Sequence, residues 1–205
     1  MRLTNIIYRS YHNFHFPFRA FTISIIIIAI LPSLIQDGMF IDGIQYAVVS
    51  KNLANGLGTF WFPFLGENWL HGGSNSFLEH PPLVYAIQSI FFRILGDSIY
   101  TERIYCFLMA ILSALLIVQI WNLVTKDNPE IKNFSWLPVL IWTGMPLVYR
   151  SFQMNVQENT MGVFLLAAVY WIVRGLNTRR NSYFYFMLAG VFIFLVFVTP
   201  LGVIF

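Results

Sequence analysis

Long apolar runs dominate this chain and restrict it to a fold that is built within a membrane. They cover roughly residues 21–35, 100–124, 135–151, 160–174 and 183–205. A helix needs about 20 apolar residues to cross the ~30 Å of hydrocarbon in a bilayer, so the third and fourth runs are short. Charged residues make up only 10% of the chain, whereas a soluble domain has about 25%. We therefore predict an all-α integral membrane protein with about five transmembrane helices.

The basic residues predict how these helices are oriented. Arg2, Arg9 and Arg19 precede the first run without any acidic residue. No small-residue cleavage site follows, so we interpret this run as an uncleaved helix with a cytoplasmic N-terminus. Alternating spans then place the basic residues of two later loops on the same side, as the positive-inside rule requires: Lys126, Lys132, Arg174, Arg179 and Arg180.

The same alternation leaves one long external segment, residues 36–99, which is rich in aromatic and apolar residues. Long loops of this kind often carry functional sites. Helical spacing of apolar residues predicts one interfacial helix that begins near Ile41 and stops before Gly56. A second pattern places Leu83, Ile87, Ile90 and Ile94 on one face, after the prolines of HPPL and before Gly96. We predict two amphipathic helices at the membrane surface, joined by an ordered loop.

Polar residues gather at this external side. Asp42 and Tyr46 are four residues apart and share a helix face. Glu79 and His80 come just before the second helix, at the positive end of its dipole. Glu158 opens the fourth span, where a lone charge beside hydrocarbon needs a partner or a function. Helix capping is the simpler explanation of Asp42 and Glu158, and plain dipole stabilisation is the simpler explanation of Glu79.

Cations and amides near these acids complete the candidate site. Arg103 and Arg150 would pair with the acids or with a phosphate, although Arg103 and Glu102 also suit simple anchoring at the end of a span. The polar residues of the turn before the fourth span would hydrogen-bond a sugar, but turns favour the same residue types: Asn155, Gln157 and Asn159.

Several stretches together resemble a known family. Asp42-x-x-x-Tyr46-Ala47, the loop GLGTFWFPFLGENWL, the stretch HPPL and the later QENTMGVFLLAAVYW follow in this order. This order is similar to that of the GT-C membrane glycosyltransferases, and within them to the aminoarabinose transferases and the dolichyl-phosphate-mannose protein mannosyltransferases. The resemblance implies that residues 1–205 are the N-terminal transmembrane domain of a longer enzyme. It also implies a multi-pass protein of the bacterial inner membrane.

The resemblance further implies transfer of a sugar from a polyprenyl-phosphate donor to a lipid, glycan or protein acceptor on the external face. Asp42 matches the acid that assists the acceptor or binds a metal, and Glu158 matches the acid of the second external loop. The family has lysine before the paired prolines, where this chain has His80. The donor phosphate would therefore need protonated His80, Arg103 or Arg150, or a divalent metal held by Asp42 and Glu79.

Two other functions remain open at this point. A transporter fragment would have polar or broken positions at mid-membrane depth, and a non-catalytic, lipid-binding scaffold would share the fold without the chemistry. No phosphate-binding loop, dinucleotide-binding motif or zinc-ligand spacing is present in the sequence. Because the basic residues cluster at membrane ends, we expect no nucleic-acid partner.

Overall fold

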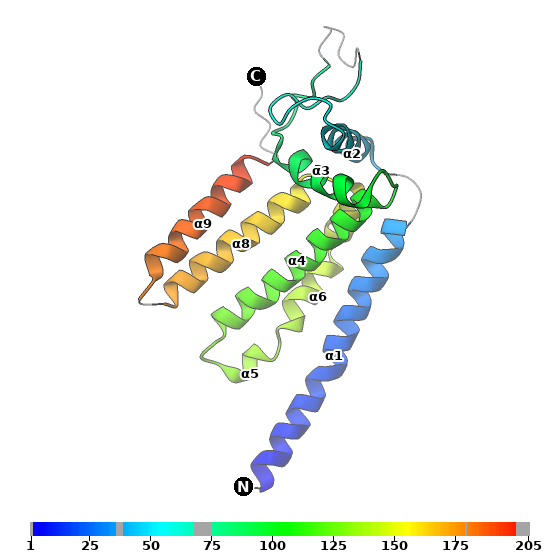
Figure 1. Ribbon diagram of the computed structural model, residues 1–205. Helices are drawn as coiled ribbons and strands as arrows, with labels where there is room; N and C mark the ends of the chain where they lie inside the picture. Colours follow the sequence, from blue (N-terminus) through cyan, green and yellow to red (C-terminus); the bar gives the residue numbers. More distant parts are fainter. Residues whose placement is uncertain (1, 36–38, 68–74, 179, 200–205) are drawn as a thin grey trace.

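The computed structural model describes residues 2–35, 39–67, 75–178 and 180–199, and the fold is an all-α membrane protein. Four helices form the bundle (Figure 1): α1 (Arg2–Ile35), α4 (Thr101–Val124), α8 (Glu158–Leu176) and α9 (Ser182–Phe197). α8 packs along both α4 and α9, while α1 projects beyond the other helices at its N-terminal end.

Three of the described helices are long and apolar enough to cross a membrane, namely α1, α4 and α8. α9 is a shorter apolar helix that covers most of the predicted fifth span. The last part of that prediction, residues 200–205, lies outside the described residues. Large apolar side chains such as Ile28, Leu165 and Phe194 are exposed on the outside of the bundle. In a bilayer this surface contacts lipid, because hydrocarbon tails solvate apolar side chains.

The prediction of a continuous third span over residues 135–151 is wrong. The chain instead forms α5 (Pro129–Lys132), α6 (Trp136–Gly144) and α7 (Pro146–Met154). Met145 is extended, with φ −76° and ψ 121°, because the residue before a proline avoids the helical conformation. The rings of Trp142 and Phe152 then lie 5.8 Å apart, whereas ten residues of straight helix would separate them by ~15 Å. The segment therefore bends sharply at Met145.

The two predicted surface helices are present as α2 (Ile41–Ala54) and α3 (Leu83–Leu95), which pack on each other across one end of the bundle (Figure 1). We call this the α2–α3 end. The N-terminus and the α4–α5 and α8–α9 connections lie at the opposite end. In the apolar stripes used for the prediction, Ile41, Ile90 and Ile94 are exposed, whereas Ile87 packs against the core of the bundle. An interfacial helix turns such a stripe toward lipid.

The protein-facing sides of α2 and α3 build a small core of their own. It consists of buried residues from both helices and the loop between them: Tyr46, Val49, Leu65, Phe77 and Tyr85. The loop is held in place by the Asn52 side chain, which donates hydrogen bonds to the backbone oxygens of Phe64 and Leu65 at 3.0 and 3.2 Å. The predicted ordered loop is thus present in its described part, whereas Trp69 lies outside the described residues.

One buried asparagine ties the second connecting turn to these helices. Asn155 has a left-handed backbone with φ 52°, which asparagine tolerates better than most residues. Its amide donates to the Gly43 backbone oxygen at 3.0 Å and accepts from Gln88 at 2.9 Å and from the Cys106 thiol at 3.2 Å. Ser50 donates in turn to Gln88 at 2.9 Å. Buried polar groups of this kind need partners, so the turn is fixed to α2, α3 and α4 together.

Gly43 permits this arrangement, because α2 lies directly against the end of α7. A Cβ atom at Gly43 would come within 2.0 Å of the Met154 backbone oxygen. No such obstacle exists at Gly162 or Gly190, which lie in α8 and α9 with open space at the same position. A side chain at residue 43 would therefore push α2 away from α7.

We expect Gly43→Ala to lower the free energy of unfolding by about 1–3 kcal/mol, because overpacking displaces the backbone. Gly162→Ala and Gly190→Ala are matched controls, and each should be neutral or raise stability by up to about 1 kcal/mol through helix propensity. Thermal unfolding of the three variants in detergent provides the comparison. Equal behaviour of all three would contradict the close contact.

Candidate active site

Tyr46 lies at the centre of the polar groups at the α2–α3 end. Its ring packs against Phe77, His80 and Tyr85, with centroid distances of 6.2, 5.6 and 5.7 Å. Burial raises the pKa of its hydroxyl, and the negative charges of Asp42, Glu158 and Glu79 raise it further. The hydroxyl therefore stays neutral in the physiological pH range and can donate a hydrogen bond.

Three carboxylates thus act on one hydroxyl from three separate segments. Asp42 is in the first turn of α2, Glu158 is the first residue of α8, and Glu79 lies in the segment before α3. Coulomb interactions of this kind weaken with distance and are screened by water. The structure therefore brings these residues into one neighbourhood, although their catalytic and binding roles stay predictions.

Helix capping does not explain the two acids. The N-cap residue of α2 is Phe40, that of α8 is Gln157, and neither makes a side-chain capping bond. Asp42 is half-buried, while Glu79 and Glu158 are exposed. The favourable interaction of a carboxylate with a helix N-terminus still applies to Asp42 and Glu158, but the capping role is absent.

Two of the three carboxylates, Glu158 and Glu79, line separate small cavities. Glu158 borders one of about 230 Å³ that also contains Ser151, Trp142 and Asn159. Glu79 and His80 border another of about 310 Å³, whose other walls include Trp61, Pro63 and Phe77. Aromatic walls beside carboxylates suit a sugar, which presents apolar faces and hydroxyl groups.

His80 is packed among rings rather than extended toward solvent. Besides Tyr46, its ring contacts Phe77 at 6.1 Å. Its Nδ1 atom is buried and has no hydrogen-bond partner among the described residues. A flexible lysine at the same position would extend outward as a point charge. The packed ring of His80 is poorly placed to take over the role of that lysine in binding a phosphate.

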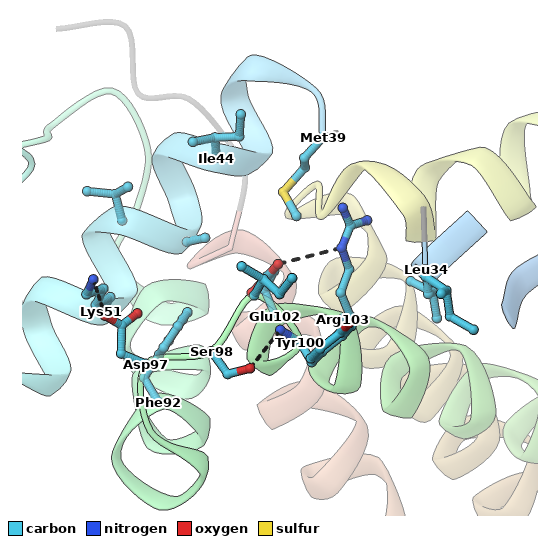
Figure 2. Close-up of a pocket in the computed structure, with 14 residues that line it drawn as sticks. Leu34, Met39, Ile44, Lys51, Phe92, Asp97, Ser98, Tyr100, Glu102 and Arg103 are labelled. Carbon is cyan, nitrogen blue, oxygen red and sulfur yellow. Dashed lines mark hydrogen bonds and ion pairs between the residues drawn. The ribbon is translucent and has the colours of Figure 1, made fainter. Parts of the chain in front are cut away.

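Arg103 borders a different cavity from those of Glu79 and Glu158. Its guanidinium donates to the Gln153 backbone oxygen at 3.0 Å, and its Nε lies 3.6 Å from Glu102. It borders a cavity of about 360 Å³ in which Lys51 and Asp97 form a 2.5 Å ion pair (Figure 2). That cavity is lined by one face of α2, namely by Ile44, Ala47, Val48 and Lys51. Asp42 and Tyr46 lie on the opposite face of the same helix.

Arg150 is exposed in α7, one helical turn before Met154. The Met154 carbonyl, at the end of α7, contacts α2 at Gly43, which is the residue after Asp42. Arg150 is therefore on the helix that contacts α2 beside Asp42. No group of three or more His, Cys, Asp or Glu side chains able to hold a metal occurs within the described residues. A metal bound by Asp42 and Glu79 would need water, substrate oxygens or phosphate to complete its coordination.

The sequence analysis did not predict the structural role of the residues that hold this site together. Asn155 and Gln157, which were considered as sugar ligands, are 4% and 2% exposed and serve instead as internal ties. The Gln157 amide donates to the Tyr85 hydroxyl. The hydroxyl groups of Tyr105 and Thr160 form another hydrogen bond, which joins α4 and α8. The only sequence signal for these ties is a run of amides beside apolar spans, which also fits an exposed turn.

The raised pKa of Tyr46 predicts a dependence of stability on pH. The folded chain keeps the Tyr46 proton at pH values where the unfolded chain loses it. The contribution of the protonated hydroxyl to the free energy of unfolding is therefore complete below about pH 10 and is lost as pH rises. The slope is at most about 1.4 kcal/mol per pH unit for one group. We expect thermal unfolding between pH 9 and 11 to be less pH-dependent in Tyr46→Phe than in the wild type.

Tyr183→Phe is the control for that measurement, because Tyr183 is 88% exposed. Its pH profile should follow the wild type. An unchanged slope in Tyr46→Phe would show that burial and the carboxylates do not raise the pKa of the Tyr46 hydroxyl.

Comparison with known proteins places this geometry in a family. Residues 79–199 match the family described as dolichyl-phosphate-mannose-protein mannosyltransferase, and no curated protein or solved structure matches the chain. The match covers more than half of the 205 residues and includes Glu79, Arg103 and Glu158. The match begins after Asp42 and Tyr46. The predicted roles of these two residues therefore rest only on where they lie in the structure. The chain belongs to the dolichyl-phosphate-mannose-protein mannosyltransferase family, whose members are membrane glycosyltransferases of the GT-C type.

Proposed function

We propose that this protein transfers a sugar from a polyprenyl-phosphate donor to an acceptor hydroxyl or amine at the α2–α3 end. The family supports glycosyl transfer from such donors at a general level. The observation that carries the proposal for this chain is that Asp42, Glu79 and Glu158, from three separate segments, each raise the pKa of the Tyr46 hydroxyl beyond the larger effect of burial. A lipid, a glycan or a protein would serve equally as acceptor.

Asp42 is the proposed general base. The acceptor oxygen or nitrogen attacks the anomeric carbon, and the bond between that carbon and the phosphate oxygen breaks. The electron pair leaves with the polyprenyl phosphate, while the acceptor proton passes to the Asp42 carboxylate. A base placed in this way accelerates the reaction by ~10²- to 10⁴-fold. Asp42 is half-buried rather than fully exposed, which keeps it fixed while leaving room for an acceptor.

Tyr46, Glu158 and Glu79 are proposed to bind and orient the substrates. The neutral Tyr46 hydroxyl donates a hydrogen bond, and the two glutamates accept hydrogen bonds from sugar or acceptor hydroxyls. His80 supplies a ring surface beside Tyr46. Each of these contacts would fix the orientation that in-line displacement needs.

The phosphate of the donor also needs positive charge. Arg150 suits this role because it is exposed and lies one turn from the α7–α2 contact beside Asp42. Arg103 is less suited, because it lies on the far side of α2 and already binds Gln153. A divalent metal held by Asp42 and Glu79 is the competing source of charge.

The proposed orientation has the N-terminus in the cytoplasm and the α2–α3 end outside, at a bacterial inner membrane. Basic residues support it, because those described in the later connections lie at the opposite end of the bundle, as the positive-inside rule expects: Lys126, Lys132, Arg174 and Arg180.

We expect Asp42→Asn to lower the rate of sugar transfer ~10²- to 10⁴-fold, because asparagine cannot accept the proton. The assay follows release of polyprenyl phosphate from polyprenyl-phosphate mannose in membranes that contain the protein. Glu67→Gln is the matched control, since Glu67 is an exposed acid at the same end, and it should leave the rate unchanged. A rate unaffected by Asp42→Asn would favour a non-catalytic scaffold or a different base.

The two sources of positive charge make opposite predictions. If Arg150 binds the donor phosphate, Arg150→Gln should lower kcat/KM roughly tenfold or more, through loss of a charge-assisted hydrogen bond, and a chelator should have no effect. If a metal bridges the phosphate, chelation should abolish transfer and added Mg²⁺ or Mn²⁺ should restore it. Kinetics of the two treatments in the same membranes decide between them.

A further inference from the structure

We propose that a second site, at the opposite end of the bundle, binds the phosphate headgroup of one anionic phospholipid. A cavity of about 750 Å³ opens there between α1, α4 and the segment from α5 to α6. Its polar lining comes from Arg19, Thr22, Asn122, Lys132, Asn133 and Ser135. This site is separate from the proposed sugar-transfer site and does not rest on it.

The lining changes from polar to apolar along the helices. On α4, Asn122 lies near the helix end, and Val118, Leu115 and Ile111 follow toward the middle of the span, over ~16 Å. On α1, Arg19 is followed by Ile23 and Ile26 in the same direction. A charged end that continues into an apolar groove matches the shape of a lipid, with its phosphate at the membrane surface and its chain in the hydrocarbon.

Arg19 provides the strongest indication of a missing anion. Its Nε atom is buried and has no hydrogen-bond partner among the described residues. Buried donors of a charged group are costly when left without an acceptor. Lys132 adds a second cation, and no acidic side chain lines the cavity within the described part of the chain. The site therefore carries two positive charges and attracts an anion.

The surrounding rings place this cavity at the membrane surface. Trp136 lines it and donates from its indole to His15 at 3.3 Å. The same indole stacks on Phe18, with 4.8 Å between the ring centroids. Tryptophan is enriched at the headgroup level of a bilayer, where one edge is wet and the other apolar. A phosphate bound by Arg19 and Lys132 would therefore be at the depth of the lipid headgroups.

A phospholipid is the occupant that these features favour. Anionic lipids are present in the bilayer that surrounds the protein, and basic pockets between transmembrane helices bind their headgroups. Polyprenyl phosphate shares the same phosphate chemistry, but its proposed reaction takes place at the α2–α3 end. We therefore assign the cavity to the leaflet lipid and use polyprenyl phosphate as a competing ligand in the test.

The test uses the full chain in detergent, titrated with phosphatidylglycerol and, separately, with phosphatidylcholine. Native mass spectrometry counts the lipids that stay bound. We expect one phosphatidylglycerol to be retained in preference to phosphatidylcholine, and Arg19→Gln with Lys132→Gln to weaken its binding roughly tenfold or more. Lys126→Gln with Arg180→Gln removes two charges at the same end outside the cavity, and it should leave binding unchanged.

A second variant separates loss of the site from loss of folding. Ala114→Trp fills the apolar part of the cavity without changing any charge and should also expel the lipid, while the circular dichroism spectrum and the elution volume stay those of the wild type. Equal binding of both phospholipids, or equal loss in the two charge variants, would overturn the proposal. Tighter retention of polyprenyl phosphate than of phosphatidylglycerol would overturn the assignment to a leaflet phospholipid.

Discussion

The buried amide of Asn155 is the interaction on which the α2–α3 end depends. It accepts from an amide of α3 and a thiol of α4 and donates to a carbonyl of α2 at once, and buried polar groups of this kind need partners. Asp42 is the neighbour of Gly43, and Glu158 follows Asn155 by three residues. The bonds of this amide therefore hold the start of α2, which has Asp42, beside the turn that leads to Glu158.

The sequence predicts elements that depend on local patterns and fails where tertiary contacts decide. Apolar length predicted the membrane-spanning helices α1, α4 and α8, and Gly56 and Gly96 indicated where α2 and α3 end. Pro146 signalled the break between α6 and α7, but the apolar run around it concealed that signal. The sequence placed α2 and α3 at the membrane surface, but it left open which residues of their apolar stripes contact lipid and which contact protein, because both accept apolar side chains. Periodicity alone does not distinguish them.

The bend at Met145 bears on the transporter alternative, because transporters use interrupted helices to bind substrates. Here the residues around the bend are Thr143, Gly144, Pro146 and Leu147, none of which is charged. The carboxylates and arginines instead lie at the two ends of the bundle. Together with the family match, this distribution favours chemistry at the membrane surface over passage through its centre. The bend then serves to bring α7 and Asn155 against α2.

The charge balance around Tyr46 also limits how a donor enters. Asp42, Glu79 and Glu158 each act on the Tyr46 hydroxyl, and carboxylates at this end would repel the phosphate of the proposed donor. His80 does not offset them as an extended lysine would, because its ring is packed between Tyr46 and Phe77. For the proposed donor, the positive charge would come from Arg150, which is exposed in α7, or from a divalent cation. Only Arg150 as the source of charge would allow the anomeric carbon to lie between the positive charge and the proposed base, because a metal held by Asp42 and Glu79 would itself be at Asp42.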